Sequence, residues 1–199
     1  HYTATDGTQG TTIPTGYSDS EWSSLGTGAY AHVSNNPSYD NTYGLLYNWW
    51  AASNVTVCPE GFHLPTDDEW KILEVNLGMC EGSGSGCVDD TGSRGTNEGS
   101  KLAGEATLWK DGNLDSNSEF GNSGFNAIPG GYRANWGENL SGPAMGGISS
   151  YFWTNTECYW TGSGCNTHAA FRIITYSQAK ISRDNYLMER GHSVRCVQD

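Results

Sequence analysis

The sequence has no long hydrophobic run and few basic residues. No apolar run approaches the roughly 20 residues that a bilayer-spanning helix requires, and the mean hydropathy is −0.57. We therefore expect no membrane insertion by this segment. Lys and Arg together number 10 against 22 Asp and Glu, which gives a net charge of −12. Because a surface with this negative net charge repels phosphate backbones and anionic lipids, we expect neither nucleic acid nor an acidic membrane as a partner.

The composition favours short strands and ordered loops over a helical bundle. The chain of 199 residues contains 27 Gly, 11 Tyr and 8 Trp. These aromatic residues are too numerous for a disordered chain. The length suits one domain covering residues 1–199, and residues 1–42, which hold few aliphatic side chains, are expected to be irregular except for a helical turn near "SDSEWSSL".

Six cysteines predict disulfide bonds. Two pairs each close a short Gly- and Ser-rich loop, Cys80–Cys87 in "CEGSGSGC" and Cys158–Cys165 in "CYWTGSGC". Cys58 is then left to pair with Cys196, although six cysteines permit other connectivities. Neither short loop has the two-residue gap of a zinc knuckle. The pairing predicts an oxidising compartment, so we expect an extracellular or cell-surface protein.

The stretch "CPEGFHLPTDDEW" at residues 58–70 is open to two interpretations. Its histidine and carboxylates could form a metal or acid–base site, or they could begin a helix. Thr66 is followed three residues later by Glu69, which is the pattern of a capping box, and Asp67 and Asp68 would lie in the first turn, where the helix dipole favours negative charge. We interpret the stretch as a helix start, and His63 as a hydrogen-bonded structural residue.

Other segments indicate an α+β fold. Residues 43–52, "YGLLYNWWAA", and 67–77 have apolar residues at helical spacing. The C-terminal half holds strand-like stretches such as "SSYFWTNTE", "HAAFRIITY" and "GHSVRCVQD". Helices followed by strands predict an antiparallel sheet at the end of the chain.

The loop "DGNLDSNSE" places an oxygen-bearing side chain at every second position, as a calcium loop does. Ser116 stands where the motif has Gly, and Asn122 where it has its bidentate Glu. A solvated polar loop is therefore favoured, with calcium as the alternative. The candidate ligands are Asp111, Asn113, Asp115, Asn117 and Glu119.

Five blocks resemble a known family. "NTYGLLYNWWAA", "CPEGFHLPTDDEWKILEVNLG", "GFNAIPGGYR", "FWTNTE" and "GHSVRCVQD" are similar, in the same order, to the signature blocks of the Fibrobacter succinogenes major paralogous (FISUMP) domain. The resemblance implies a fold similar to the formylglycine-generating-enzyme and C-type-lectin-like folds, with two helices on a twisted antiparallel sheet and long irregular loops. It also implies a bacterial surface or secreted protein.

The chain departs from the family pattern in two ways. Family members usually carry a further segment before this one, so either the chain is truncated or a neighbour supplies a strand. The two short cysteine loops are not family features. The related formylglycine-generating enzymes bind copper through a close cysteine pair, but the gap between Cys158 and Cys165 is wider, and a structural disulfide is favoured there. We expect no catalytic residues.

Two functions compete. The first is a structural subunit of a self-assembling appendage or filament. The second is a glycan- or protein-binding display domain, because Tyr, Trp and Arg are common anchors at binding surfaces. Of these aromatic residues, we expect Trp153 inside and the cysteine-loop residues outside. The candidate ligand-binding residues are Tyr159, Trp160, His168, Tyr176 and Arg183.

Two N-glycosylation patterns are also present. They begin at Asn54 in "NVT" and at Asn139 in "NLS". Such triplets arise often by chance in a chain rich in Asn, Ser and Thr.

Overall fold

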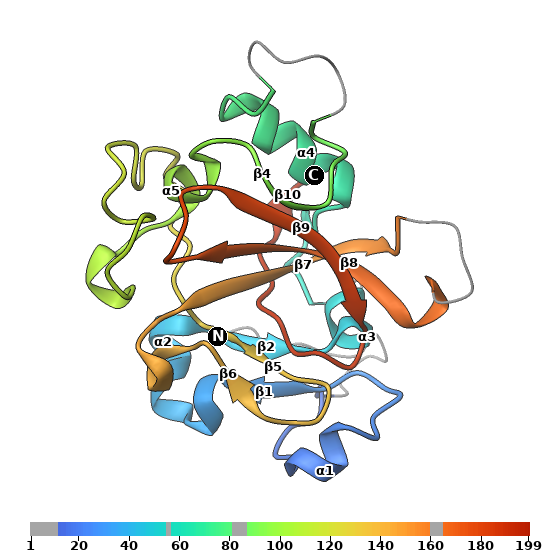
Figure 1. Ribbon diagram of the computed structural model, residues 1–199. Coiled ribbons are helices and arrows are strands. Elements are labelled where there is room, and N and C mark those ends of the chain that lie inside the picture. The colour runs from blue at the N-terminus through green and yellow to red at the C-terminus, as the bar shows by residue number, and fades with distance from the viewer. Residues whose placement is uncertain (1–11, 55–56, 81–86, 160–164) are drawn as a thin grey trace.

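The structure, a computed structural model, describes residues 12–54, 57–80, 87–159 and 165–199. The described parts consist of short helices and several antiparallel sheets (Figure 1), so the fold is of the α+β class. The elements are α1 (Asp19–Trp22), β1 (Tyr30–His32), η1 (Val33–Asn35), η2 (Pro37–Tyr39), α2 (Asp40–Tyr43), β2 (Leu45–Tyr47), α3 (Trp49–Ala52), β3 (Phe62–His63), α4 (Asp67–Asn76), β4 (Gly92–Arg94), α5 (Glu98–Leu102), η3 (Ala106–Leu108), β5 (Tyr132–Arg133), β6 (Asn139–Leu140), η4 (Pro143–Met145), β7 (Ser149–Glu157), η5 (Cys165–Thr167), β8 (His168–Thr175), β9 (Ile181–Leu187) and β10 (Val197–Gln198).

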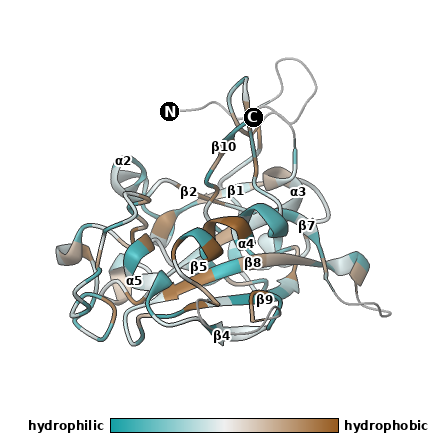
Figure 2. Ribbon diagram, turned by 90° about the horizontal axis from the view of Figure 1, so that it is seen from above, coloured by the Kyte–Doolittle hydropathy of each residue, from teal (hydrophilic) through white to brown (hydrophobic). Residues whose placement is uncertain are grey.

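A four-stranded antiparallel sheet in the order β4-β9-β8-β7 organises the molecule. Three two-stranded ribbons surround it, formed by β1 with β2, β3 with β10, and β5 with β6. Figure 2, seen from above, shows α4 lying over the large sheet, with hydrophobic positions in the helix and in the strands below it. The strands predicted in "SSYFWTNTE" and "HAAFRIITY" are therefore confirmed as β7 and β8 of this sheet, whereas "GHSVRCVQD" forms only β10, which pairs with β3 outside it.

Each face of the sheet carries its own hydrophobic cluster. Successive side chains of a strand point to opposite faces, so Phe152 packs on the α4 side with Trp70, whereas Trp153 packs on the other side with Phe171. Trp153 is 0% exposed, which confirms the prediction that it lies inside. Burial of such large aromatic side chains accounts for most of the hydrophobic stabilisation of a small domain.

The predicted helix start at residues 66–69 is confirmed. The side chain of Thr66 accepts a hydrogen bond from the Glu69 N–H, and the Glu69 carboxylate accepts one from the Thr66 N–H at 2.7 Å. The helical turn predicted near "SDSEWSSL" is also present as α1, with a second capping box between Ser18 and Glu21. Local capping chemistry was therefore a reliable guide to where these helices begin.

The predicted helix over residues 43–52 is wrong. Gly44 has φ +74°, a backbone conformation outside the helical region, and Leu45–Tyr47 form β2, which pairs with β1. A single helical turn follows as α3, capped by Asn48, whose side chain accepts from the Ala51 N–H. The expected pair of helices is thus replaced by α4 and several shorter helices.

The structure contains the three disulfides expected from the cysteine spacing. They join Cys58 to Cys196, Cys80 to Cys87 and Cys158 to Cys165. The first spans 138 residues and holds the C-terminal segment against the middle of the chain. It sits beside the β3–β10 ribbon, so the two features fix the same end of the molecule.

Candidate functional site

A buried cluster of charges joins α4 to the large sheet. The Glu74 carboxylate receives two hydrogen bonds from Arg94, at 2.8 and 2.9 Å, and one from Arg172 at 2.7 Å. Arg172 also donates to Asp67 at 2.7 Å, and Arg183 donates to the other oxygen of the same carboxylate at 2.6 Å. All five side chains are buried. We call them the Asp67–Glu74 network.

This network gives Asp67 a buried role in addition to its predicted place in the first turn of α4. Burial raises the pKa of Asp67, but the hydrogen bond from Arg183 and the charge of Arg172 outweigh that effect and hold the pKa well below its usual range. The carboxylate is therefore ionised and paired. The next residue of the first turn, Asp68, is exposed.

A shallow cleft opens above the network. It measures about 330 Å³, and the guanidinium of Arg183 lies 3.7 Å from the ring centroid of Tyr159 there. Burial raises the pKa of the Tyr159 phenol, so it stays protonated at neutral pH. We call this the Tyr159 cleft, and its lining consists of Asp67, Asp68, Lys71, Asp89, Thr156, Tyr159 and Arg183.

The predicted ligand-binding residues do not all share one surface. Tyr159 and Arg183 meet in the Tyr159 cleft, and Trp160 lies outside the described residues. His168 begins β8, near the Tyr186 ring, whereas Tyr176 follows the far end of that strand beneath Lys110. Eight residues of strand separate the last two by about 25 Å. The set therefore divides into at least three places.

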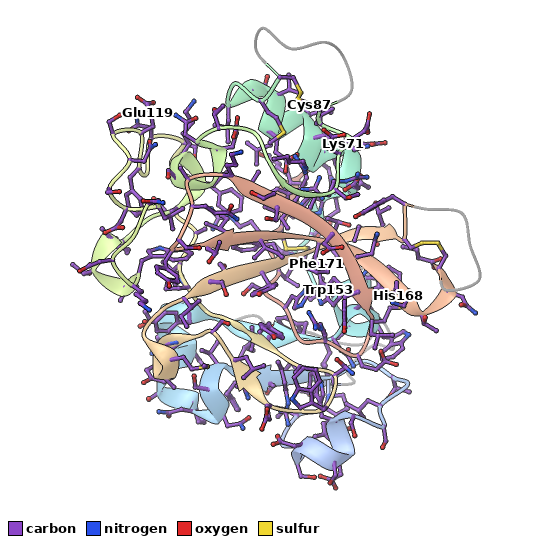
Figure 3. All side chains as sticks on the ribbon, viewed as in Figure 1. Lys71, Cys87, Glu119, Trp153, His168 and Phe171 are labelled. Atoms are coloured by element: carbon purple, nitrogen blue, oxygen red, sulfur yellow. A yellow bond between two sulfur atoms is a disulfide. The ribbon has the colours of Figure 1, made fainter. Side chains whose placement is uncertain are left out.

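The candidate calcium loop forms local hydrogen bonds. The Asp115 carboxylate accepts from the Gly112 N–H at 2.8 Å, and the Asn113 amide donates to a backbone carbonyl at 3.0 Å. Asn117 accepts from the Glu119 N–H at 2.9 Å, and Asp111 is exposed. Figure 3 places Glu119 at the periphery of the molecule. Among the described residues, no group of three or more His, Cys, Asp or Glu side chains is arranged to hold a metal ion.

The two glycosylation triplets begin at Asn54 and at Asn139. The amide nitrogen of Asn139, the atom that a glycan would modify, donates to Asn35 at 2.9 Å. Asn54 is described, but the two residues after it are not. Glycosylation would replace one of the two hydrogens on this nitrogen, and the other remains available for the hydrogen bond to Asn35.

A larger groove lies where the middle of the chain meets its C-terminal segment. It measures about 720 Å³ and is lined by side chains from residues 40–47, 57–62 and 193–196. Burial, with smaller effects from Tyr30 and Asp40, raises the pKa of Tyr47 in this groove to about 12, so its phenol remains a hydrogen-bond donor. We call this the β2 groove; the sequence did not indicate it.

Two histidines near these sites have different roles. His63 lies between two carboxylates, 2.6 Å from Asp199 and 2.8 Å from Glu69, as expected of a hydrogen-bonded structural residue. His192 is fully buried and stacks on Trp153 with centroids 4.1 Å apart. Burial holds the pKa of His192 well below its usual value, so it is neutral.

The signal for the Asp67–Glu74 network was present in the sequence. Asp67 and Glu74 are seven residues apart, so they lie on the same face of a helix as Trp70. A carboxylate on the buried face of a helix requires a buried partner. One of those partners, Arg172, lies in the predicted strand "HAAFRIITY", whereas Arg94 and Arg183 lie in segments that were not predicted to be strands.

Comparison with known proteins identifies the family. No curated protein and no solved structure matches the chain, and no helix in the described parts is both long enough and apolar enough to cross a membrane. The family model described as Fibrobacter succinogenes major domain matches residues 2–198, which is nearly the whole chain. The chain therefore belongs to the Fibrobacter succinogenes major domain family.

Proposed function

We propose that this chain is a non-enzymatic, extracellular bacterial surface protein that serves as a structural subunit of a self-assembling appendage or filament. The family suggests a surface-related protein, and three disulfides are consistent with an oxidising compartment outside the cell. A scaffold of the C-type-lectin-like kind belongs to the same proposal.

The observation that carries the proposal is the exposure of large apolar side chains both on α4 and in the β5–β6 region. On α4, Ile72 is 61% and Val75 is 49% exposed. Trp136, in the loop between β5 and β6, is 47% exposed, and Met145 shortly after β6 is 50% exposed. Figure 1 shows α4 in the upper part of the molecule and the β5–β6 ribbon in the lower part, above α1.

Two different exposed surfaces on one subunit suit head-to-tail assembly, in which one surface contacts the other surface of the next subunit. A contact between one surface and a different one on the next subunit leaves a free surface at each end, so growth continues unless the rotation closes a ring. Exposed apolar groups of this size also gain free energy when they are covered. We call the surfaces the α4 surface and the Trp136 surface.

The test uses one variant of each surface. Ile72→Lys places a charge on the α4 surface, and Trp136→Lys places one on the Trp136 surface. Ser118→Lys, at an exposed loop position that belongs to neither surface, is the matched control. We expect fibres from the unchanged protein and the control in negative-stain microscopy, and monomers from each surface variant in light scattering.

Mixing the two surface variants sharpens this test. Each variant keeps one intact surface, so head-to-tail contact predicts that the mixture forms dimers and nothing larger. Dimers from one variant alone would indicate a contact of each surface with itself. An unchanged protein that stays monomeric near 21.5 kDa at high concentration would reject the filament role.

The second candidate, a display domain for a glycan or protein, is favoured by the Tyr159 cleft. Tyr159 and Arg183 are residue types common at binding surfaces, and they are held against each other there. Tyr159→Ala should weaken binding of a glycan or protein found by screening, without lowering the melting temperature by more than a few degrees. A copper-dependent oxidase is the distant alternative, and the Cys158–Cys165 pair would have to be reduced before it could bind copper.

A further inference from the structure

The β2 groove, at about 720 Å³, has the size of a small-ligand site. It forms where two chain segments separate. Tyr47 of β2 and His192 exchange both backbone hydrogen bonds, at 2.8 and 2.9 Å. Toward Leu45 on one segment and Val194 on the other, the described residues show no further backbone bonds between them. The groove lies along this divergence.

Covalent and main-chain links hold the lining of the groove in place. Cys196, at one side of the groove, is bonded to Cys58. Phe62, another lining residue, belongs to β3, which pairs with β10. Tyr47 is fixed by its two bonds to His192. A ligand therefore meets a site that is already formed, and little binding free energy is lost in ordering the protein around it.

Three aromatic rings line the groove. Tyr43 and Tyr47 are partly exposed, and Phe62 is 40% exposed. Each ring offers a flat apolar face, on which the C–H groups of a ligand can pack. Covering such exposed apolar area is favourable, because it removes that area from water. The rings therefore provide affinity for a ligand that has an apolar face of its own.

Polar groups that the protein does not use accompany these rings. Burial raises the pKa of the Tyr43 phenol, and it raises that of Tyr47 to about 12, so both phenols stay protonated. Among the described residues, neither phenol has a hydrogen-bond partner, and the same is true of the exposed side-chain amide of Asn41. Phenols and amides can each donate and accept. The groove thus offers hydrogen bonds of both kinds beside its apolar faces.

Asp40 adds a fixed acceptor to the lining. His32 Nδ1 lies 2.9 and 3.0 Å from its two carboxylate oxygens. The charge of Asp40 also contributes to the raised pKa of Tyr47, which makes this carboxylate and that phenol neighbours. A carboxylate has about four acceptor positions, so Asp40 can accept from a ligand hydroxyl while it stays bonded to His32.

The charge of the protein favours a neutral ligand. The net charge of −12 repels anions. The base in the lining, Arg195, places its guanidinium 4.6 Å from the ring centroid of Phe125, which is not a lining residue. A fully apolar ligand is also disfavoured, because it would bury the phenols and the amide without hydrogen bonds.

We propose that the β2 groove binds a neutral oligosaccharide. A sugar ring has an apolar C–H face and a rim of hydroxyl groups that both donate and accept, which matches aromatic faces set beside phenol, amide and carboxylate groups. The β2 groove shares no lining residue with the Tyr159 cleft, the α4 surface or the Trp136 surface. The inference is therefore independent of the filament role.

β2 offers too few main-chain groups for an added peptide strand to be the better occupant. Both main-chain groups of Tyr47 are taken by His192. Successive residues of an antiparallel strand direct their N–H and C=O alternately toward and away from the partner, so Leu46 faces β1 and Leu45 faces away from it. Gly44, with φ +74° and ψ −154°, precedes the strand. Of the three residues of β2, all described, Leu45 alone has such groups to spare, whereas strand addition needs a row of them.

The test measures binding of soluble neutral hexasaccharides to the full, oxidised protein. The probes are cellohexaose, xylohexaose, mannohexaose and maltohexaose, and saturation-transfer NMR detects their binding whether the protein is monomeric or assembled. We expect at least one probe to bind with a dissociation constant of about 1 mM or tighter. Absence of binding by all of the probes would overturn the inference.

Substitutions in the groove locate the bound sugar. Tyr47→Phe removes one phenol and keeps the ring, so it should weaken binding about fivefold, the effect of about one lost hydrogen bond. Phe62→Leu keeps an apolar side chain but removes the flat ring face, and should weaken binding about tenfold. Tyr186→Phe removes a phenol from a 38% exposed ring that does not line the groove, and is the matched control. If Tyr47→Phe does not fold, Tyr43→Phe provides the same test.

The variants also separate this site from the other proposals. Full affinity in both groove variants, with loss in Tyr159→Ala, would place the sugar in the Tyr159 cleft, support the display role there and overturn the inference. Binding of a mixture of uncharged hexapeptides, with no binding of any sugar, would assign the groove to a peptide and overturn it as well. Fibres that bind no sugar would reject this inference alone, and a monomer that binds sugar in the groove would reject the filament alone.

Discussion

Removing one carboxylate from the Asp67–Glu74 network should destabilise the protein severely. Glu74 is 0% exposed and receives hydrogen bonds from Arg94 and Arg172. Glu74→Gln keeps the shape of the side chain but leaves two buried guanidinium groups without their shared anion. Breaking a buried ion pair in this way costs about 3–5 kcal/mol, and in a chain of this length that corresponds to a fall of roughly 10 °C in melting temperature.

The assay is denaturation by guanidinium chloride, followed by fluorescence with the disulfides intact. Asp68→Asn is the matched control, because its side chain is 85% exposed and pairs only with Lys71 at the surface, so it should cost less than about 1 kcal/mol. If Glu74→Gln lowers the free energy of unfolding by less than about 1 kcal/mol, as the control should, the reasoning is refuted. The buried guanidinium groups would then not depend on the Glu74 carboxylate for their charge balance.

The remaining predictions concern pH and the disulfides. Hydrogen bonds to Asp199 and Glu69 raise the pKa of His63, so protonated His63 stabilises the folded state fully below its unfolded pKa of about 6.5. That stabilisation is lost as the pH rises through the higher pKa of His63 in the folded state. The unchanged protein should therefore be more stable than His63→Gln at low pH, and this difference in the free energy of unfolding should shrink above about pH 6.5. A difference that stays constant up to pH 9 would contradict this. For the disulfides, replacing both members of the 138-residue bridge with Ser should cost about 5 kcal/mol, and replacing both members of the Cys158–Cys165 bridge about 2.5 kcal/mol, by the loop-entropy relation. Denaturant melts of the two double variants check the order, and equal losses would show that loop length does not set the effect.

Local chemical cues in the sequence predicted structure well. The capping boxes fixed the starts of α1 and α4 because their side chains bond within three residues. The short cysteine loops likewise needed only local proximity. The helix predicted over residues 43–52 failed because its apolar spacing also suits a strand, and pairing of β2 with β1 decided between them.

The candidate sites are formed by residues that are far apart in the sequence and meet only in the folded structure. The helix dipole gave a local reason for Asp67, and although its position on the helix face of Trp70 called for a buried partner, the sequence did not identify which arginines supply it. Arg172 and Arg183 lie more than 100 residues away, at 105 and 116 positions from Asp67, and only the strand register brings them together. The β2 groove arises from the divergence of two segments, which has no residue signature of its own.

The Cys58–Cys196 bridge also determines how the protein would carry mechanical load. A pulling force applied to the chain before Cys58 and after Cys196 passes through the sulfur–sulfur bond and bypasses everything between them. The 138 residues enclosed correspond to roughly 480 Å of extended chain that cannot be drawn out while the bond is intact. The large sheet, the Asp67–Glu74 network and both hydrophobic clusters on that sheet lie largely within this enclosed part. A surface protein built in this way would lengthen under tension only through its first segment, and its main sheet would not be stretched.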